Sequence, residues 1–290
     1  MTDRRARIRE RVAERLLSVA AWLSGLAVLG ILAFLAYFCL PLLRGEADIW
    51  SWDWRPFQGH FGILPMIVGS LLLSGLALAG AFPVALGMCS LLLGLGPPRL
   101  AASVLGAVRL MTGVPTIVYA FVSALLLVPF VRGAFAEGSG YSLLSATLVL
   151  SVLILPTIVL LVHAHWTARA SELRLTCESL GLTRAQAVWH VLIPVSRHAL
   201  LLAAILGFAR AVGDTMIALL LSGNAAQVPR SPLEAMRSLT AHIALVHATD
   251  SQDAAYASIF AAGLILLATT GALSIAVRAM QGGGARANAR

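Results

Sequence analysis

The sequence contains no lysine and has few charged residues of any kind. Only 12% of its 290 residues are charged, whereas a soluble domain carries about 25%. Hydrophobic residues make up 59% of the chain, and the mean hydropathy is +0.87. This balance excludes a large water-soluble core and indicates an integral membrane protein.

Cysteine and catalytic motifs are also scarce. The three cysteines, Cys39, Cys89 and Cys177, fall in or beside different apolar runs. This spacing argues against a disulfide framework or a metal site and predicts small core residues. The chain has no Gly-x-x-x-x-Gly-Lys phosphate loop, so we do not expect it to hydrolyse ATP by that route. We find no catalytic set of side chains, and we expect no bound cofactor or metal.

Six apolar runs are long enough to cross a bilayer, which takes about 20 residues each. They comprise residues 16–43, 64–95, 104–131, 141–163, 195–222 and 254–279. The first run is longer than the core of a signal peptide, and no small-residue cleavage site ends it, so we interpret it as a retained helix. The sequence therefore predicts an all-α integral membrane protein with six transmembrane helices.

The arginines are unevenly distributed over the segments between these runs. If the N-terminus is cytoplasmic, fifteen arginines lie inside, five lie outside and one lies within a span. The positive-inside rule favours this orientation, with both termini in the cytoplasm. The divisions are a basic N-terminal segment (1–15), a transmembrane domain (16–280) and a flexible tail (281–290). No basic–aromatic face accompanies the charge, which argues against nucleic-acid binding.

The largest inside segment, residues 164–194, is too polar to cross a membrane and too regular for a slack linker. Gly181 interrupts an amphipathic helical pattern, and Thr183 can cap the helix that follows. We expect a short helix-turn-helix on the cytoplasmic face, where a partner contacts it.

Two opposite charges stand inside the fifth apolar run, in "GFARAVGDTM" (207–216). Placing Arg210 there costs at least about 2.5–3.5 kcal/mol, and arginine does not escape by losing its proton. Asp214 lies four residues on, on the same helical face. The pair either only fixes helix packing or lines a path. Because a buried ion pair adds little net stability and a guanidinium forks to tetrahedral oxyanions, we favour an anion path.

Three threonines extend this candidate path. In "TGVPT" (112–116), glycine and proline can open the helix so that Thr112 and Thr116 line a cavity, although a packing kink is equally compatible. Thr215 follows Asp214 directly. The alternating tryptophans of "WSWDW" (50–54) are typical of an interfacial aromatic belt, with a docking surface for a soluble partner as the alternative.

The inside segment resembles the EAA loop of ABC importer permeases. Gly181 is followed by nine residues and then Val-Leu-Ile-Pro (191–194), which matches the family spacing from glycine to Ile-x-Leu-Pro. The family's Glu-Ala-Ala positions hold Leu-Thr-Cys (175–177) here. The resemblance implies a coupling helix that sits in a groove of a cytoplasmic ATPase. The coupling residues that it implies are Glu178, Gly181, Leu182, Thr183 and Arg184.

Four further stretches are similar to the Pst-type phosphate importer permeases, in particular the PstC-like subunit. They are "FGILPMIVGSLL" (61–72), "TGVPTIVYAF" (112–121), "ARAVGDTMIALLLSGN" (209–224) and "PLEAMRSLTAHIAL" (232–245). The match covers roughly residues 61–280. One position departs from the family pattern Arg-x-x-Gly-Glu-Thr, because Asp214 stands where glutamate is expected.

The resemblance implies a type I ABC importer permease fold in a bacterial inner membrane. It implies phosphate import by alternating access, with a PstA-like second permease, a dimeric ATPase that binds ATP and Mg, and an extracytoplasmic phosphate-binding protein. Asp214 then selects protonated phosphate over sulfate, gates the path or only pairs with Arg210. Molybdate, tungstate or sulfate remains an alternative substrate. A phosphate-sensing subunit or an ion-coupled transporter remains an alternative function.

Overall fold

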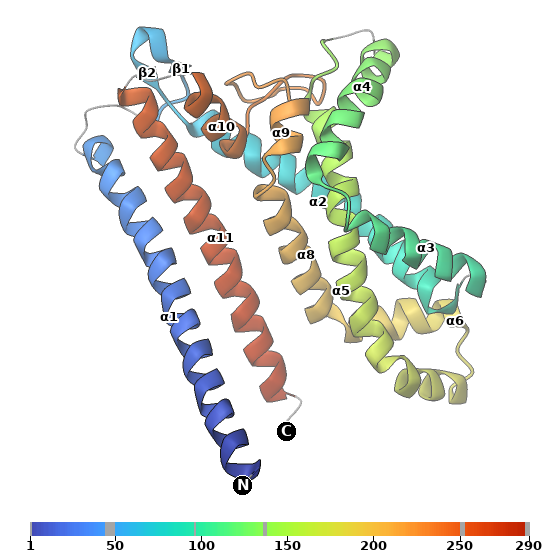
Figure 1. Ribbon diagram of the computed structural model, residues 1–290. Helices are drawn as coiled ribbons and strands as arrows, with labels where there is room; N and C mark the ends of the chain where they lie inside the picture. The colour runs from blue at the N-terminus through green and yellow to red at the C-terminus, as the bar shows by residue number, and fades with distance from the viewer. Residues whose placement is uncertain (1, 44–49, 96, 136–137, 250–252, 288–290) are drawn as a thin grey trace.

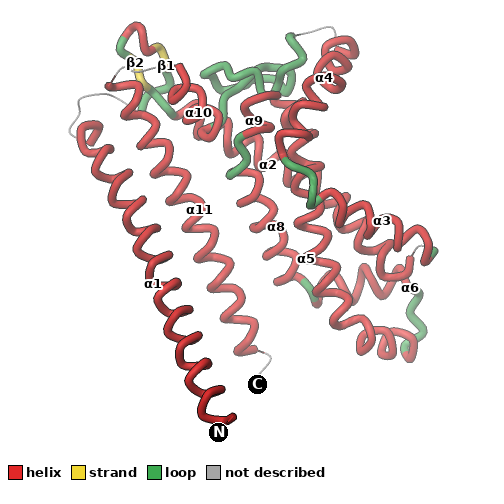
Figure 2. The backbone as a smooth tube through the Cα atoms, viewed as in Figure 1, coloured by secondary structure: helices red, strands yellow, loops and turns green. Residues whose placement is uncertain are grey.

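The computed structural model describes residues 2–43, 50–95, 97–135, 138–249 and 253–287, and these are predominantly helical (Figures 1 and 2). The elements, in chain order, are α1 (Thr2–Leu43), β1 (Trp54–Arg55), η1 (Pro56–Gln58), β2 (His60–Phe61), α2 (Leu64–Ser90), η2 (Leu91–Leu95), α3 (Pro98–Met111), α4 (Thr116–Phe135), α5 (Leu143–Ser179), α6 (Arg184–Gln186), η3 (Ala187–Leu192), α7 (Ile193–Val195), α8 (Arg197–Val212), α9 (Met216–Leu221), α10 (Leu239–Thr249) and α11 (Asp253–Ala287). The short strands β1 and β2 form one antiparallel hairpin. The all-α fold class is confirmed.

Within the described residues, five helical stretches are long and apolar enough to cross a membrane. They are Val12–Cys39, Leu64–Leu93, Thr116–Phe135, Leu143–Ala168 and Ser258–Met280. A sixth candidate is broken: the helical stretches 184–195 and 197–212 pass the same criterion together and are bent by 74°. This bent pair brings the candidate spans in the described residues to six, the number that the sequence predicts. Its first stretch falls almost entirely in the segment 164–194, which the sequence places outside the membrane, so the membrane-crossing part is the second stretch, α8 (Arg197–Val212).

Two of the predicted spans are divided in the structure. The run 104–131 is divided, because α3 ends at Met111 and α4 begins at Thr116. Pro115 causes this division, since proline has no backbone N–H and disfavours helical geometry at the residue before it. The run 195–222 is divided into α8 and α9 by a break at residues 213–215.

The ends of the chain are more helical than the sequence suggests. Helix α1 begins at Thr2, so the basic segment and the first span form one helix. Helix α11 continues to Ala287, so helix covers most of the predicted tail. The start of α1 and the end of α11 lie at the same end of the molecule, away from the β1–β2 hairpin (Figure 1).

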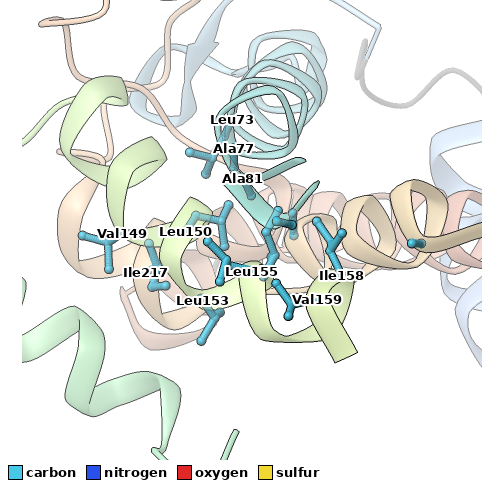
Figure 3. Packing of buried hydrophobic residues seen from close by; sticks show 14 of the residues in the cluster. Leu73, Ala77, Ala81, Val149, Leu150, Leu153, Leu155, Ile158, Val159 and Ile217 are labelled. Carbon is cyan, nitrogen blue, oxygen red and sulfur yellow. The ribbon is translucent and has the colours of Figure 1, made fainter. Parts of the chain in front are cut away.

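The core forms where α5 packs against α2. Helix α2 carries Ala77, Ala81 and Ala85 at intervals of four residues, and each is at most 1% exposed. Such small side chains allow helices to approach closely in a membrane. The Ser151 hydroxyl of α5 donates a hydrogen bond to the Ala77 carbonyl at 3.0 Å. Figure 3 shows larger α5 side chains, including Leu150, packed beside Ala77 and Ala81.

Helix α8 joins this core through Gly207. A Cβ atom at this position would lie 2.9 Å from two side-chain carbons of Ile158 on α5. Because Ile158 is fully buried, only a residue without a side chain permits this approach. Gly207 therefore sets the distance between α8 and α5, and with it the position of the break at the end of α8.

The end of the molecule that carries the β1–β2 hairpin is closed by contacts between the hairpin, α10 and α11. The Trp54 ring meets the His242 ring edge to face, with centroids 4.4 Å apart, and His242 Nε2 lies 3.1 Å from the Ser258 hydroxyl on α11. Helix α1 packs on α11 through stacked Phe38 and Phe260 rings, 4.7 Å apart. All three cysteines are free and buried, which confirms them as small core residues.

Candidate substrate path

Asp214 lies in the break between α8 and α9, between the C-cap residue Gly213 and the N-cap residue Thr215. Its carboxylate atom Oδ2 accepts a hydrogen bond from the backbone N–H of Ile217 at 2.8 Å. A side-chain oxygen that accepts from an N–H three residues on is the usual cap of a helix N-terminus. Asp214 directly precedes Thr215, the N-cap residue of α9, and its side chain holds the first turn of that helix from this position. Its own N–H donates to the Ala211 carbonyl at the end of α8 at 3.3 Å.

Arg210 lies in the last turn of α8, and its side chain is exposed. A cation is favoured there because the carbonyl end of a helix carries partial negative charge. Arg210 and Asp214 form no ion pair within 4.0 Å in the part of the chain that the structure describes, although their charges are close enough to interact. The N–H groups of the Arg210 guanidinium are therefore available to a ligand. A direct Arg210–Asp214 ion pair that fixes helix packing is not observed.

A cavity of about 370 Å³ opens beside this break. Its lining residues are Thr116, Leu153, Arg210, Gly213, Asp214, Thr215 and Met216. A water molecule occupies about 30 Å³ in the liquid, so the cavity has room for a small hydrated anion. It holds one positive charge, one negative charge and two hydroxyl groups, which is a polar lining for a membrane-embedded position.

Four of the five path residues predicted from the sequence meet at this cavity. Thr112 does not line the cavity. Its hydroxyl donates to the Arg109 carbonyl at 2.7 Å and thereby supplies a hydrogen bond to a backbone carbonyl at the end of α3. The turn that follows positions Thr116 at the start of α4. The predicted opening of the helix by glycine and proline is thus observed, and it brings one of the two threonines to the cavity.

The sequence did not single out two apolar lining residues. Leu153 comes from α5, and Met216 is the first residue of α9. Leu153 carries no sequence signal, since one leucine in an apolar helix resembles any other. Met216 follows Thr215 directly. Aspartate is a common capping residue, so Asp214 could have predicted a helix that begins close to Met216.

The turn that the sequence predicts at Gly181 is observed at the end of α5. Gly181 has a φ of +67°, and the Leu182 N–H donates to the Cys177 carbonyl at 3.0 Å. Glycine in this left-handed conformation with a six-to-one hydrogen bond is a Schellman motif, which ends a helix. The first helix of the predicted helix-turn-helix is the continuation of the membrane-crossing α5 rather than a separate element.

Thr183 begins the next helix with a complete capping box. Its hydroxyl accepts from the Gln186 N–H at 3.4 Å, and the Gln186 side chain accepts from the Thr183 N–H at 2.9 Å. The predicted cap is therefore confirmed. Arg184 follows on the exposed surface, and the side chain of Glu178 lies outside those that the structure describes.

Two exposed apolar side chains flank this turn. Leu180 is 68% exposed and Trp189 is 67% exposed. The sequence interpretation did not select either residue. Their signal was a large apolar side chain in a segment that is too polar to enter the membrane, which is typical of a contact surface.

Comparison with known proteins agrees with this architecture. Residues 85–282 match the family described as "Binding-protein-dependent transport system inner membrane component". The probable ABC transporter permease protein YqgH of Bacillus subtilis is 32% identical over 222 residues, which are 76% of this chain and 71% of that protein. The phosphate transport system permease protein PstC of Pasteurella multocida is 30% identical over 253 residues, 80% of this chain and 78% of that protein.

A PstC protein of Mycobacterium tuberculosis is 28% identical over 259 residues, which are 81% of this chain and 77% of that protein. Among solved structures, a chain of the inward-facing MetNI methionine ABC transporter superposes with a TM-score of 0.56 and 19% identity. The superposition covers 73% of this chain and 93% of that one.

The helical bundle, the broken helix and the capped turn define a multi-pass membrane permease with the type I ABC importer fold. The chain belongs to the family of binding-protein-dependent transport system inner membrane components. The expected similarity to PstC-like permeases is confirmed. The chain is thus an inner-membrane permease subunit of an ABC importer.

Proposed function

We propose that this permease moves inorganic phosphate into the cell by alternating access. The observation that carries the proposal is the cavity in which Arg210 and Asp214 lie together without forming an ion pair. A guanidinium donates two parallel hydrogen bonds to a tetrahedral oxyanion. Several relatives whose names specify phosphate transport are similar over about four fifths of the chain, which supports the same substrate.

Asp214 supplies selectivity in this proposal. The Ile217 N–H holds one carboxylate oxygen, and the other makes no hydrogen bond within the described residues. Phosphate near neutral pH retains a proton that it can donate to this free oxygen. Sulfate has no such proton and meets only repulsion from the carboxylate. An unpaired acceptor that faces a like charge is an effective means of rejection.

The other parts of the importer are supplied by partners. A PstA-like second permease completes the pore, and a cytoplasmic ATPase dimer binds ATP and Mg and drives the cycle. An extracytoplasmic binding protein delivers phosphate. The exposed Leu180 and Trp189 beside the capped turn provide an apolar contact for the ATPase. The ends of α1 and α11 at one end of the molecule, together with the arginine distribution, support cytoplasmic termini.

Uptake of radiolabelled phosphate by vesicles that contain the assembled importer tests the proposal. Arg210→Gln is expected to abolish uptake, because an amide keeps hydrogen-bond donors but loses the charge that attracts the anion. Arg99→Gln is the matched control, since Arg99 is exposed on α3 and lies away from the cavity. Normal uptake by Arg210→Gln contradicts the path.

Asp214→Asn tests selectivity in the same vesicles. The amide oxygen retains the helix cap, but the variant no longer repels sulfate, so we expect sulfate to compete with phosphate more strongly than in the wild type. An unchanged preference for phosphate contradicts selection by Asp214. Competition by molybdate or tungstate above that of phosphate in the wild type favours the alternative of another oxyanion permease. A complex that binds phosphate without uptake favours a sensing subunit.

A further inference from the structure

We infer that Thr240 is a positioning residue for the substrate path: its hydroxyl fixes the backbone of Asp214 from outside the broken helix. The inference rests on the proposed function, because it concerns the same cavity. Thr240 belongs to α10, which is too short to be one of the candidate membrane spans. It is not among the residues that line the cavity.

The central contact joins Thr240 to the break itself. Thr240 Oγ1 donates to the backbone carbonyl of Asp214 at 3.0 Å. In an uninterrupted helix, a carbonyl accepts from the N–H four residues on. At this break the carbonyl of Asp214 instead receives a hydrogen bond from a side chain that is 26 residues away in the sequence.

The direction of the adjoining hydrogen bonds follows from counting protons. The Ser238 and Thr240 hydroxyl oxygens are 3.0 Å apart, and a hydroxyl carries only one hydrogen. Because Thr240 donates its hydrogen to Asp214, Ser238 is the donor to Thr240. Ser238 Oγ in turn accepts from the Ala241 N–H at 3.1 Å. The result is a directed chain in which each hydrogen bond polarises the next.

The start of α10 is itself held by the core. The Leu239 N–H donates to the Ser70 hydroxyl of α2 at 2.8 Å. Ser70, Ser238 and Thr240 are all buried, so water does not readily replace these bonds. The start of α10 is thus bonded to α2, and Thr240 on α10 holds the Asp214 backbone at a fixed position relative to α2.

Three hydrogen bonds together hold Asp214. Its N–H donates to Ala211, its Oδ2 accepts from Ile217 and its carbonyl accepts from Thr240. The first two lie within α8 and α9 and move with them. Of these three hydrogen bonds, the Thr240 bond is the one that links the break to a different part of the described chain, so it determines where the free carboxylate oxygen stands relative to Arg210 and the rest of the cavity.

Thr240→Val tests this role, because valine keeps the branched shape and removes the hydroxyl. We expect the KM for phosphate uptake by the assembled importer in vesicles to rise about tenfold, as for loss of one buried hydrogen bond, with a smaller change in the maximal rate. Thr240→Ser restores the hydroxyl and is expected to restore the wild-type KM. Thr269→Val is the matched control, since the Thr269 hydroxyl donates to the Ile265 carbonyl of its own helix and, among the described residues, forms no bond to another element.

Hydrogen–deuterium exchange gives a readout that does not depend on the substrate. In the purified complex, we expect Thr240→Val to accelerate exchange of the amides in residues 213–219, and Thr240→Ser and Thr269→Val to leave it unchanged. An unchanged KM, or unchanged exchange, in Thr240→Val overturns the inference. A wild-type complex without phosphate uptake overturns the proposed function instead, while accelerated exchange in Thr240→Val still supports the positioning of Asp214.

Discussion

At the scale of single residues, Asp214 combines two tasks that require the same carboxylate. One oxygen accepts a hydrogen bond from the first turn of α9, and the residue also lines the cavity. A glutamate at this position, which the resemblance to the Pst-type permeases leads us to expect, has one more methylene, and a longer side chain is a poorer helix cap. The shorter aspartate therefore ties the cavity charge to the helix start.

Asp214→Ala is expected to destabilise the protein more than Asp214→Asn. Alanine removes the cap, which costs about 0.5–2 kcal/mol, whereas asparagine keeps a side-chain oxygen for the Ile217 N–H. Thermal unfolding of the purified importer in detergent measures the difference. Equal unfolding midpoints for the two variants contradict the capping role.

His242 makes the stability of the end that carries the β1–β2 hairpin depend on pH. Burial, reinforced by the charge of Arg237, lowers the pKa of His242 to about 3. The ordinary pKa of histidine is about 6.5. Below this pH, His242 is protonated in the unfolded chain but stays neutral in the folded chain. The free energy of unfolding is therefore unaffected by the protonation of His242 above about pH 6.5. It falls progressively as the pH falls toward 3, by up to about 1.4 kcal/mol per pH unit.

His242→Gln is expected to reduce this loss, because glutamine does not titrate and can still bond Ser258. Thermal unfolding at about pH 7 and about pH 5 provides the comparison. His60→Gln, at an exposed position of β2, is the control. If His242→Gln loses as much stability on acidification as the wild type, buried His242 is not the cause.

At the scale of elements, the close packing of α8 on α5 requires glycine at position 207. Gly207→Ala places a methyl group 2.9 Å from Ile158, and overpacking of this kind costs about 1–3 kcal/mol. We expect a lower unfolding midpoint and weaker phosphate uptake, because the break at Asp214 moves with α8.

Ile158→Val provides the rescue, since it removes Cδ1, one of the two carbons that the new methyl group would meet. The double variant Gly207→Ala with Ile158→Val is expected to recover most of the stability that Gly207→Ala loses. Gly87→Ala on α2 is the control, because nothing lies within 4 Å of a Cβ atom there. Strictly additive effects of the two substitutions contradict direct contact as the cause.

At the scale of the whole molecule, the features with strong local patterns could be predicted. Apolar length predicted the spans, and Gly181 with Thr183 predicted the cytoplasmic turn. The relation of Arg210 to Asp214 could not be predicted. Two residues that are four positions apart lie on one face only where the helix is continuous. Because α8 ends at Val212, this rule does not apply to Arg210 and Asp214. The hydrogen bond from Leu239 to Ser70 joins residues 169 positions apart, so local sequence gives no indication of it.

The surface at the capped turn makes a final prediction about assembly. Trp189 is exposed, and a large aromatic side chain in a contact surface commonly contributes much of the binding free energy. We therefore expect Trp189→Ala to weaken association with the ATPase about tenfold or more, which corresponds to at least about 1.4 kcal/mol. The dissociation constant for the purified ATPase, measured with the permeases in lipid discs, tests this expectation.

Trp52→Ala is the matched control for this measurement. Trp52 is 60% exposed and stands two residues before β1 (Trp54–Arg55) in the chain. The β1–β2 hairpin lies at the end of the molecule opposite the start of α1 (Figure 1). Trp52→Ala is expected to leave the affinity for the ATPase unchanged. If Trp189→Ala binds the ATPase as tightly as the wild type does, the ATPase contact lies elsewhere. Equal weakening by both variants indicates a general loss of folding rather than loss of a contact.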